Sequence, residues 1–309
     1  MIFFKPNFWD KNKISFFSIL LFPITILIKV VIFFKPYLVK NYKYPIPIIC
    51  VGNIYLGGTG KTPISIKIFS ILQDLGMHPV FIRKKYDNFK DEFELQKKTG
   101  PIFQNKKRSI AINEAIAAKA NIAILDDGFQ DFSIKKNLSV ICFNEKKWIG
   151  NGLSIPSGPL RESLFSLKRA NCVVINGDKN DIIEMELLKY NKELKIFYSR
   201  YKPLNIDKYK NKKIIAFAGI GNPENFFSLL VDNDINILRK IKFPDHYNYS
   251  KKEIENLIKT AQEKNALLLT TEKDYCRIEK NYKDKINFLK VLVEIKDQNK
   301  FTEEIKKII

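Results

Sequence analysis

Histidine, cysteine and arginine are scarce in this chain of 309 residues. The first two scarcities argue against metal sites, and the third singles out a few residues for attention. With two histidines, His78 and His246, a zinc site built from imidazoles is improbable. The four cysteines are widely spaced, so they suit buried thiols in a reducing compartment better than a metal site. Seven of the 53 basic residues are arginine, and these few are candidates for bidentate roles that lysine cannot fill.

The chain also lacks an uncharged run long enough to cross a bilayer. Residues 14–28 carry no charge, but they fall short of the roughly 20 residues that a spanning helix needs, and Pro23 would bend them. A signal peptide is disfavoured because no small-residue cleavage site follows. We expect residues 1–40 to form a helix or shallow hairpin on the cytoplasmic face of a membrane. A single spanning helix that tolerates Lys29 is the alternative, and a buried first helix is less favoured because apolar residues cover all faces.

A net charge of +20 favours anionic partners such as nucleotide phosphates, acidic lipid headgroups or nucleic acid. Lysines that only solvate the surface are the alternative for many of these charges. No recognisable DNA- or RNA-binding motif occurs, so we do not expect a nucleic-acid partner.

Residues 47–75 have the pattern of a buried strand, a glycine-rich turn and a helix. Glycines in the turn allow positive φ, so successive N–H groups can point at phosphate oxygens. In a phosphate loop the lysine reaches the β- and γ-phosphates and the next hydroxyl binds Mg²⁺. Tyr55 stands where that pattern has its first glycine, and a turn that merely joins strand to helix is the alternative. The predicted nucleotide-binding residues are Gly57, Gly58, Thr59, Gly60, Lys61 and Thr62.

A second apolar strand, residues 122–125, ends in the carboxylates Asp126 and Asp127. Downstream of a phosphate loop, this arrangement supplies a Mg²⁺-bound carboxylate for phosphoryl transfer. Two adjacent aspartates would repel one another without a cation or a basic neighbour, so a metal explains the pair better than a plain turn does.

Strand and helix signals alternate along the chain, which predicts an α/β fold with a mainly parallel sheet and nucleotide at its carboxyl edge. A Lys- and Tyr-rich connector at 200–213 marks a boundary between a nucleotide-binding domain, residues 41–205, and a second domain, residues 206–309. The second domain has no further GKT loop, so it is not expected to bind a second nucleotide. Its helix after Ser250 has a capping-box pattern, with Glu253 three residues on.

Taken together, these motifs resemble the tetraacyldisaccharide 4'-kinases, the lipid A 4'-kinases of Gram-negative bacteria. The resemblance implies a P-loop NTPase-type α/β/α sandwich and a second, smaller α/β/α domain, bridged by a two-stranded sheet and enclosing the active site in a cleft. It also implies transfer of the γ-phosphoryl group of ATP to the 4'-hydroxyl of a tetraacylated glucosamine disaccharide 1-phosphate, at the cytoplasmic face of the bacterial inner membrane. The motifs that carry it are VGNIYLGGTGKTP from Val51, DDGFQ from Asp126, PSGPLRES from Pro156, AFAGIGNPENFF from Ala216, FPDHYNYS from Phe243 and LLTTEKDYCRI from Leu268.

The resemblance assigns roles to residues on both sides of the reaction. On the acceptor side it implies that Asp91 is the base toward the sugar hydroxyl and that His246 pairs with it. A solvated charge at 91 and an ordinary loop histidine at 246 are the alternatives. On the nucleotide side the implied residues are Lys61 for phosphate, Thr62, Asp126, Asp127 and Glu162 for Mg²⁺, and Gln130 and Arg161 lining the same site.

This chain departs from the family pattern mainly on the acceptor side. The Ser-Arg-Gly-Tyr-Gly segment appears as residues 82–86, without its glycines, and Lys90 and Phe93 flank the acid pair where the family has Gly and Pro. Asp131 replaces the His after DDGFQ. The rival function is a membrane-associated partition-type ATPase, but those proteins carry Lys directly before the two glycines, where this chain has Leu56.

Overall fold

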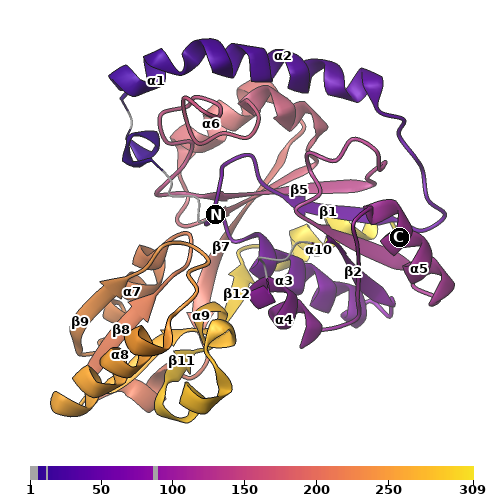
Figure 1. Cartoon of the computed structure of the whole chain (residues 1–309). Helices are drawn as coiled ribbons and strands as arrows, with labels where there is room; N and C mark the ends of the chain where they lie inside the picture. The colour runs from indigo at the N-terminus through magenta and orange to yellow at the C-terminus, as the bar shows by residue number, and fades with distance from the viewer. Residues whose placement is uncertain (1–5, 12, 86–89) are drawn as a thin grey trace. The chain divides into compact units, whose positions relative to one another are not determined.

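The computed structural model describes residues 6–11, 13–85 and 90–309, which fall into two compact units (Figure 1). The first unit contains residues 6–11, 13–85, 99–200 and 294–309, and the second contains residues 90–98 and 201–293. Tyr86, the last residue of the altered 82–86 segment, lies outside the described residues.

The first unit is built on a sheet with the strand order β12-β7-β6-β5-β1-β4-β2-β3. Strand β1 pairs in parallel with β4 on one side and β5 on the other, and all three strands are buried along their length. The strands are β1 (Ile48–Gly52), β2 (Pro79–Lys84), β3 (Ile102–Asn105), β4 (Ile122–Asp126), β5 (Leu138–Asn144), β6 (Cys172–Asn176), β7 (Lys195–Pro203) and β12 (Val291–Ile295). The expected parallel sheet is confirmed, with β1 at its centre.

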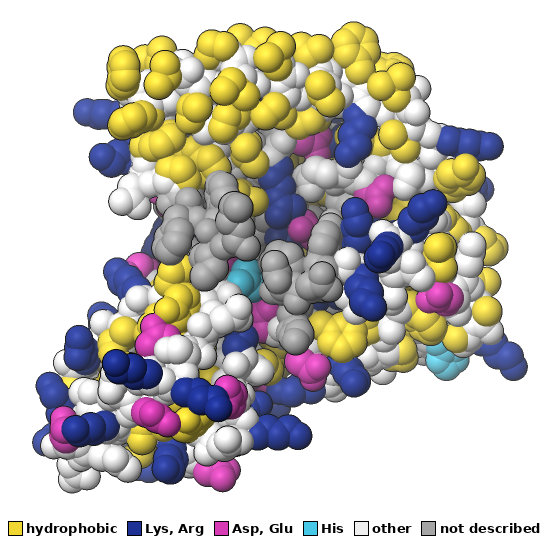
Figure 2. All heavy atoms as spheres, in the orientation of Figure 1, with side chains coloured by type: hydrophobic (Ala, Val, Ile, Leu, Met, Phe, Trp, Pro, Cys, Tyr) yellow, Lys and Arg dark blue, Asp and Glu magenta, His cyan; other side chains and the backbone are white. Residues whose placement is uncertain are grey.

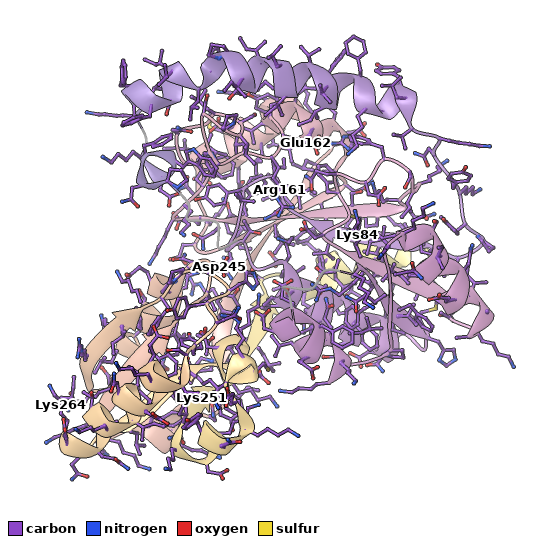
Figure 3. All side chains as sticks on the ribbon, viewed as in Figure 1. Lys84, Arg161, Glu162, Asp245, Lys251 and Lys264 are labelled. Carbon is purple, nitrogen blue, oxygen red and sulfur yellow. The ribbon has the colours of Figure 1, made fainter. Side chains whose placement is uncertain are left out.

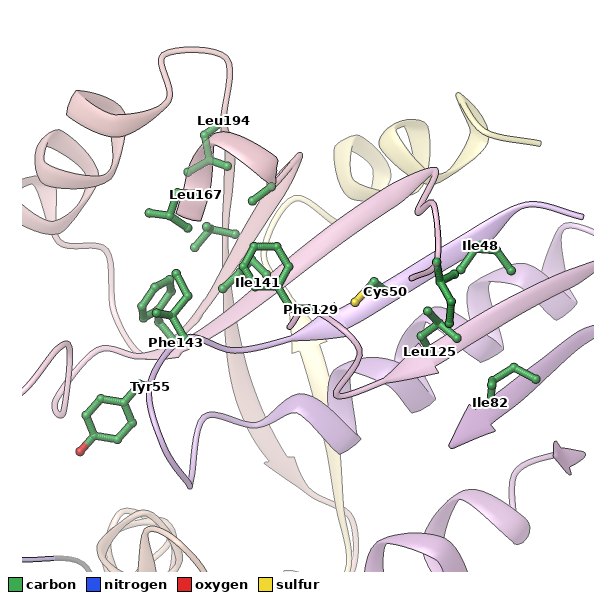
Figure 4. Close-up of a cluster of buried hydrophobic side chains, with 14 of the residues drawn as sticks. Ile48, Cys50, Tyr55, Ile82, Leu125, Phe129, Ile141, Phe143, Leu167 and Leu194 are labelled. Atoms are coloured by element: carbon green, nitrogen blue, oxygen red, sulfur yellow. The ribbon is translucent and has the colours of Figure 1, made fainter. Parts of the chain in front are cut away.

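Apolar side chains from these strands form the main core (Figure 4). Cys50, Cys142 and Cys172 are fully buried among them, as expected for structural thiols. Burial raises the pKa of Cys50 to about 11 and that of Cys142 and Cys172 to about 12, so these thiols stay protonated near neutral pH. The helices of this unit beyond its amino-terminal segment are α3 (Lys61–Asp74), α5 (Arg108–Ala117), η2 (Leu164–Arg169), α6 (Asp181–Tyr190) and α10 (Gln298–Lys306).

The amino-terminal segment forms η1 (Asn7–Asp10), α1 (Phe16–Leu20) and α2 (Phe22–Leu38). Its polarity is inverted, because two hydroxyl side chains face the protein and the large apolar side chains face outward. Ser18 and Thr25 are fully buried, and the Thr25 hydroxyl donates to Ser157 Oγ at 2.8 Å. Figure 2 shows hydrophobic side chains gathered over α1 and α2, where Phe16 is 74% exposed and Leu27 67%. The alternative of a buried first helix is therefore wrong, because the large apolar side chains of α1 and α2 are exposed. Among the described residues, no helix has both the length and the apolar character that a membrane crossing requires.

The second unit has a four-stranded parallel sheet in the order β11-β10-β8-β9. The capping box predicted at Ser250 is confirmed, because Ser250 and Glu253 each bond the other's backbone N–H. The strands are β8 (Ile214–Ala218), β9 (Ile237–Lys242), β10 (Leu267–Thr271) and β11 (Asn287–Leu289), and the helices are α4 (Lys90–Lys97), η3 (Ile206–Tyr209), α7 (Pro223–Val231), α8 (Lys251–Glu263), α9 (Glu272–Arg277) and η4 (Lys280–Lys285).

The structure divides the chain differently from the predicted ranges 41–205 and 206–309 in two places. Helix α4, which carries Asp91, groups with the second unit although it lies between two strands of the first. The last residues, 294–309, group with the first unit because α10 packs there through Phe301, whose ring meets Phe197 of β7 at 5.0 Å. The unit boundaries fall within β7 and β12, and these strands are neighbours in the eight-stranded sheet rather than a separate pair.

Gly52 at the end of β1 tests the packing of this sheet. A Cβ at this position would lie 2.6 Å from the Cβ of Phe129, so Gly52→Ala forces the chain apart where two loops of the candidate site meet. We expect a loss of about 1–3 kcal/mol in unfolding free energy, as for other overpacked cores. Denaturant unfolding measures the loss, with Ser70→Ala on the exposed face of α3 as the control. A variant as stable as the wild type would contradict the close approach.

Candidate active site

The glycine-rich loop joins β1 to the amino end of α3, as predicted. Gly57 has φ 85°, Gly58 54° and Gly60 85°, so three glycines hold left-handed conformations that other residues adopt only at a cost. Gly60 caps α3, and Lys61 is the first residue of the helix. The loop can therefore offer backbone N–H groups and the positive end of a helix dipole to an anion.

Tyr55, which replaces the first glycine of the phosphate-loop pattern, is 1% exposed and belongs to the hydrophobic core (Figure 4). Its hydroxyl donates to Asp10, and Leu56 N–H donates to the carbonyl of Pro159 at 2.9 Å. The backbone N–H of Arg161 also donates to Ile54, at 2.7 Å. Tyr55 thus anchors the start of the loop to the core and to the segment around Pro159.

A buried amide holds the loop from inside. Asn53 Nδ2 donates to Thr59 Oγ1 at 3.1 Å and to the carbonyl of Tyr55, which ties the two halves of the turn together. Gln130 Nε2 donates to the carbonyl of Asn53 at 3.0 Å. Gln130, predicted to line the nucleotide site, therefore links the DDGFQ segment to the loop through the backbone.

The predicted acids meet basic side chains at the end of β4. Arg161 Nη1 lies 2.7 and 2.9 Å from the two carboxylate oxygens of Asp127, and Lys61 Nζ lies 3.9 Å from one of them. Arg83 lies 3.5 Å from Asp126. The structure thus brings Lys61, Asp126, Asp127 and Arg161 together, and the mutual repulsion of the two aspartates is offset by arginine and lysine.

Arg108 of α5, which sequence reasoning missed, holds the acid turn by its backbone. Asp127 has a left-handed φ of 52°, and Arg108 Nη2 donates to its carbonyl at 2.8 Å and to that of Asp126 at 3.3 Å. Arg108 Nη1 also donates to Asp131 at 3.1 Å. Burial opposes ionisation of Asp131, but bonds from Ser133 and the charge of Arg108 lower its pKa. The replacement of histidine by Asp131 therefore creates an ion pair that anchors Arg108.

Glu162 follows Arg161 in the chain (Figure 3) and pairs with Arg169. Burial raises the pKa of Glu162 although the Arg169 charge opposes the rise. Its place among the Mg²⁺ ligands stays a prediction.

The predicted Mg²⁺ ligands fit the ion by their donor chemistry. Thr62, Asp126, Asp127 and Glu162 offer only oxygen atoms, which this hard cation prefers. Among the described residues, no three Asp, Glu, His or Cys side chains form a ready metal cage. Mg²⁺ at kinase sites commonly takes one or two carboxylates and completes its shell with substrate phosphates and water, so such a cage is not required.

A second charged cluster lies within the second unit. Asp91 of α4 is 2% exposed, its Oδ1 lies 3.3 Å from His246 Nδ1, and its Oδ2 accepts from Arg277 Nη2 at 2.7 Å. His246 has a φ of 55°, a conformation that is uncommon outside glycine and often marks functional sites. The predicted pairing of Asp91 with His246 is therefore present as a contact, and Asp91 is not a solvated charge.

The electrostatic surroundings of Asp91 keep it ionised. Burial opposes its ionisation, but the contact with His246 and the charges of Lys273 and Arg277 outweigh burial and hold the pKa of Asp91 well below its usual range. Lys273 itself pairs with Glu92 at 2.8 Å, and Lys98 pairs with Glu272 at 3.1 Å. Two ion pairs therefore connect α4 with α9, and a third joins α9 to Lys98, the residue after α4.

The scarcity of arginine was the signal that could have located the residues missed. Arg200 and Arg239 are exposed. The other five each pair with an acid at a candidate site: Arg83, Arg108, Arg161, Arg169 and Arg277. Of the expected bidentate roles, Arg161 contacts both oxygens of Asp127, and Arg108 and Arg277 each bond an acid and a backbone carbonyl.

The fold and this loop define a P-loop nucleotide-binding protein of the α/β class. The family model described as tetraacyldisaccharide-1-P 4'-kinase matches residues 17–309. The tetraacyldisaccharide 4'-kinase of Pelagibacter ubique is 43% identical, and that of Rickettsia bellii 34%, each over 98% of both chains. A crystal structure of LpxK from Aquifex aeolicus in complex with ATP covers 94% of this chain and 99% of its own, with a TM-score of 0.73 and 24% identity, and so has the same fold. The chain belongs to the tetraacyldisaccharide 4'-kinase family.

Lys61 provides the direct test of the nucleotide site. Lys61→Ala removes the ammonium group at the end of the loop, so we expect turnover to fall on the order of 100-fold or more, as when a comparable electrostatic donor is removed. Steady-state ATP turnover and ATP titration measure the effect, with Lys67→Ala in the same helix as the control. Full activity in Lys61→Ala would rule out this loop as the phosphate site.

Proposed function

We propose that this protein transfers the γ-phosphoryl group of ATP to the 4'-hydroxyl of a tetraacylated glucosamine disaccharide 1-phosphate. The observation that carries the proposal is the left-handed glycine loop ending in Lys61 beside the Asp126–Asp127 pair, in a chain of this kinase family. The partition-type ATPase is not favoured, because relatives named as 4'-kinases align over nearly the full length of the chain.

On the nucleotide side, the backbone of residues 57–60 and the Lys61 ammonium bind the phosphates. Bound Mg²⁺ would be held by Thr62 and the acids Asp126, Asp127 and Glu162, and it would neutralise charge that develops on the phosphates. Arg161 and Lys61 both contact Asp127. Arg161 is therefore close enough to Lys61 to place a second positive charge beside the nucleotide phosphates. Arg108 and Gln130 keep the acid turn and the loop in register through backbone carbonyls.

On the acceptor side, the Asp91–His246 couple takes the proton of the sugar hydroxyl. A hydroxyl is a poor nucleophile near neutral pH, so a base within hydrogen-bond reach accelerates the attack. The Asp91 side chain is buried, whereas that of His246 is 24% exposed. We assign the ionised Asp91 as the base predicted from the sequence, with His246 holding and polarising it.

The lipid nature of the acceptor agrees with the inverted helices α1 and α2. We propose that their exposed apolar face rests on an anionic membrane surface at the cytoplasmic side, so that the enzyme meets its acylated substrate there. A groove of about 660 Å³ between α2 and residues 154–169 is lined by Phe33, Phe34 and Phe165 and reaches Arg161 and Glu162. An acyl chain in this groove would place its headgroup near the acids of the first unit.

The assay for the function uses purified protein, ATP, Mg²⁺ and the acylated disaccharide 1-phosphate. Mass spectrometry should find a product heavier by one phosphate, attached at the 4' position. ATP consumption without a phosphorylated lipid would reject the proposal and leave an ATPase.

Asp91→Asn tests the acceptor side alone. The amide keeps the size of the side chain but cannot accept a proton, so we expect kcat to fall by about 10²–10⁴-fold while ATP affinity stays nearly unchanged. Glu94→Gln, at an exposed position of the same helix, is the matched control. Equal activity of Asp91→Asn and wild type would remove Asp91 from the role of base.

The apolar face of α2 is tested by vesicle flotation. Leu27→Asp combined with Val31→Asp places two charges on side chains that are each 67% exposed, so binding to phosphatidylglycerol vesicles should fall at least about 10-fold. Ile182→Asp combined with Met185→Asp changes two exposed apolar residues of α6 and is the control. Unaltered vesicle binding of the α2 variant would contradict this orientation.

A further inference from the structure

The LLTTEKDYCRI segment has no role in the reaction as described so far, although it supplies the charges around Asp91. Within this segment Arg277, in the last turn of α9, is the side chain that bonds the Asp91 carboxylate directly. Its side chain is 7% exposed, and its terminal nitrogens donate to Asp91 Oδ2 at 2.7 Å, to the Gly219 carbonyl at 2.8 Å and to Asp274 Oδ1 at 3.0 Å.

The acceptors of Arg277 connect it to both members of the proposed proton-accepting couple. One guanidinium nitrogen bonds the carboxylate of Asp91 directly. The other bonds the carbonyl of Gly219, which also accepts the backbone N–H of His246 at 3.1 Å. A single planar side chain therefore links the Asp91 carboxylate with the backbone that sets the position of His246.

Asp274, on the side of Arg277 away from Asp91, is fixed by several hydrogen bonds. Asp274 accepts hydrogen bonds from the Gly219 N–H at 3.0 Å, from the Tyr249 hydroxyl at 2.7 Å and from the Thr271 hydroxyl at 2.6 Å. Gly219 has no room for a side chain, because a Cβ there would lie 2.9 Å from the Tyr249 oxygen. The fully buried carboxylate of Asp274 thus holds one side of the guanidinium, and the other side bonds Asp91.

We propose that Arg277 is a positioning residue for phosphoryl transfer, which fixes the Asp91 carboxylate and the loop of His246 in their reactive arrangement. This inference rests on the proposed function and names a residue of the same acceptor site. Lysine cannot replace Arg277 fully, because one ammonium group lacks the fixed fork that reaches three acceptors at once. The neighbouring acid Glu92 is held separately by Lys273, so the two adjacent acids have different partners.

Arg277 also affects the charge of the couple. Among the described residues, the charged groups beside Asp91 include Arg277 and Lys273 from α9, His246 from its loop and the adjacent Glu92. Asp274 lies on the far side of the guanidinium, and Asp245 lies 3.8 Å from His246 Nε2. Removing the Arg277 cation disfavours the ionised carboxylate, so the couple gains a proton at higher pH. The acid limb of the pH–rate profile should therefore move upward.

The test compares Arg277→Gln and Arg277→Lys with wild type, using the full chain and the lipid kinase assay. For Arg277→Gln we expect kcat to fall at least about 10-fold, ATP affinity to stay unchanged, and the acid limb of kcat to move up by about one pH unit. Arg277→Lys keeps the charge, so its acid limb should stay near that of wild type while kcat recovers only in part. Arg239→Gln, at an exposed position of β9, is the control.

Unfolding temperatures of each variant show whether the protein is folded. Wild-type kcat in Arg277→Gln would overturn the inference, and so would a lower kcat with an unmoved acid limb, since that pattern reports packing alone. If Arg277→Gln behaves as wild type while Asp91→Asn is inactive, only the role of Arg277 fails. If no variant and no wild-type protein phosphorylates the lipid, the proposed function itself fails.

Discussion

Carboxylates gathered in a partly buried site repel one another and resist desolvation, and in this protein arginine side chains offset both costs. Asp126, Asp127 and Asp131 face Arg83, Arg161 and Arg108 in the first unit, and Asp91 faces Arg277 in the second. A nearby opposite charge favours the ionised form of a carboxylate, and an ionised carboxylate can bind a cation or take a proton. In a chain that mostly uses lysine for positive charge, Arg108 and Arg277 each hold an acid and a backbone carbonyl at the same time, which the planar fork of arginine allows.

The backbone carries the other half of the site. Three left-handed glycines form the loop before α3, and Asn53 ties its two halves together, so contacts within the chain hold its geometry. Gln130 and Arg108 then hold the acid turn through carbonyls of the main chain rather than through side chains. An arrangement that is already formed loses little entropy when phosphate binds, and rigid support of this kind keeps reacting groups in register.

The amino-terminal helices bury hydroxyl groups and expose large apolar side chains, which is the opposite of helices that pack on a hydrophobic core. Ser18 and Thr25 are buried against Asn151, Ser154 and Ser157, while phenylalanine, leucine and isoleucine face outward. In water this arrangement exposes apolar area at a cost, so it is stable only where something apolar covers it. In the function we propose, a lipid surface supplies that cover and also holds the acylated substrate, which would connect the polarity of α1 and α2 to the choice of substrate.

The local pattern of the sequence was enough for the elements and for the residues near them in the chain. Alternating apolar runs predict the strands, and the glycines of residues 57–60 predict a turn that needs positive φ, because both depend on near neighbours alone. Lys61 with Asp126 and Asp127 could be placed together because the carboxyl ends of parallel strands meet at one edge of a sheet. Contacts between distant segments could not be found in this way: Asp91 with Arg277 joins residues 186 positions apart, and Arg108 reaches the carbonyls of Asp126 and Asp127. The sequence by itself therefore determined the loop, the sheet and the family. Only the tertiary structure decided which cation neutralises which acid, that α4 belongs with the second unit, and that the first helices bury their hydroxyls, because each of these depends on what the folded chain brings within a few ångströms.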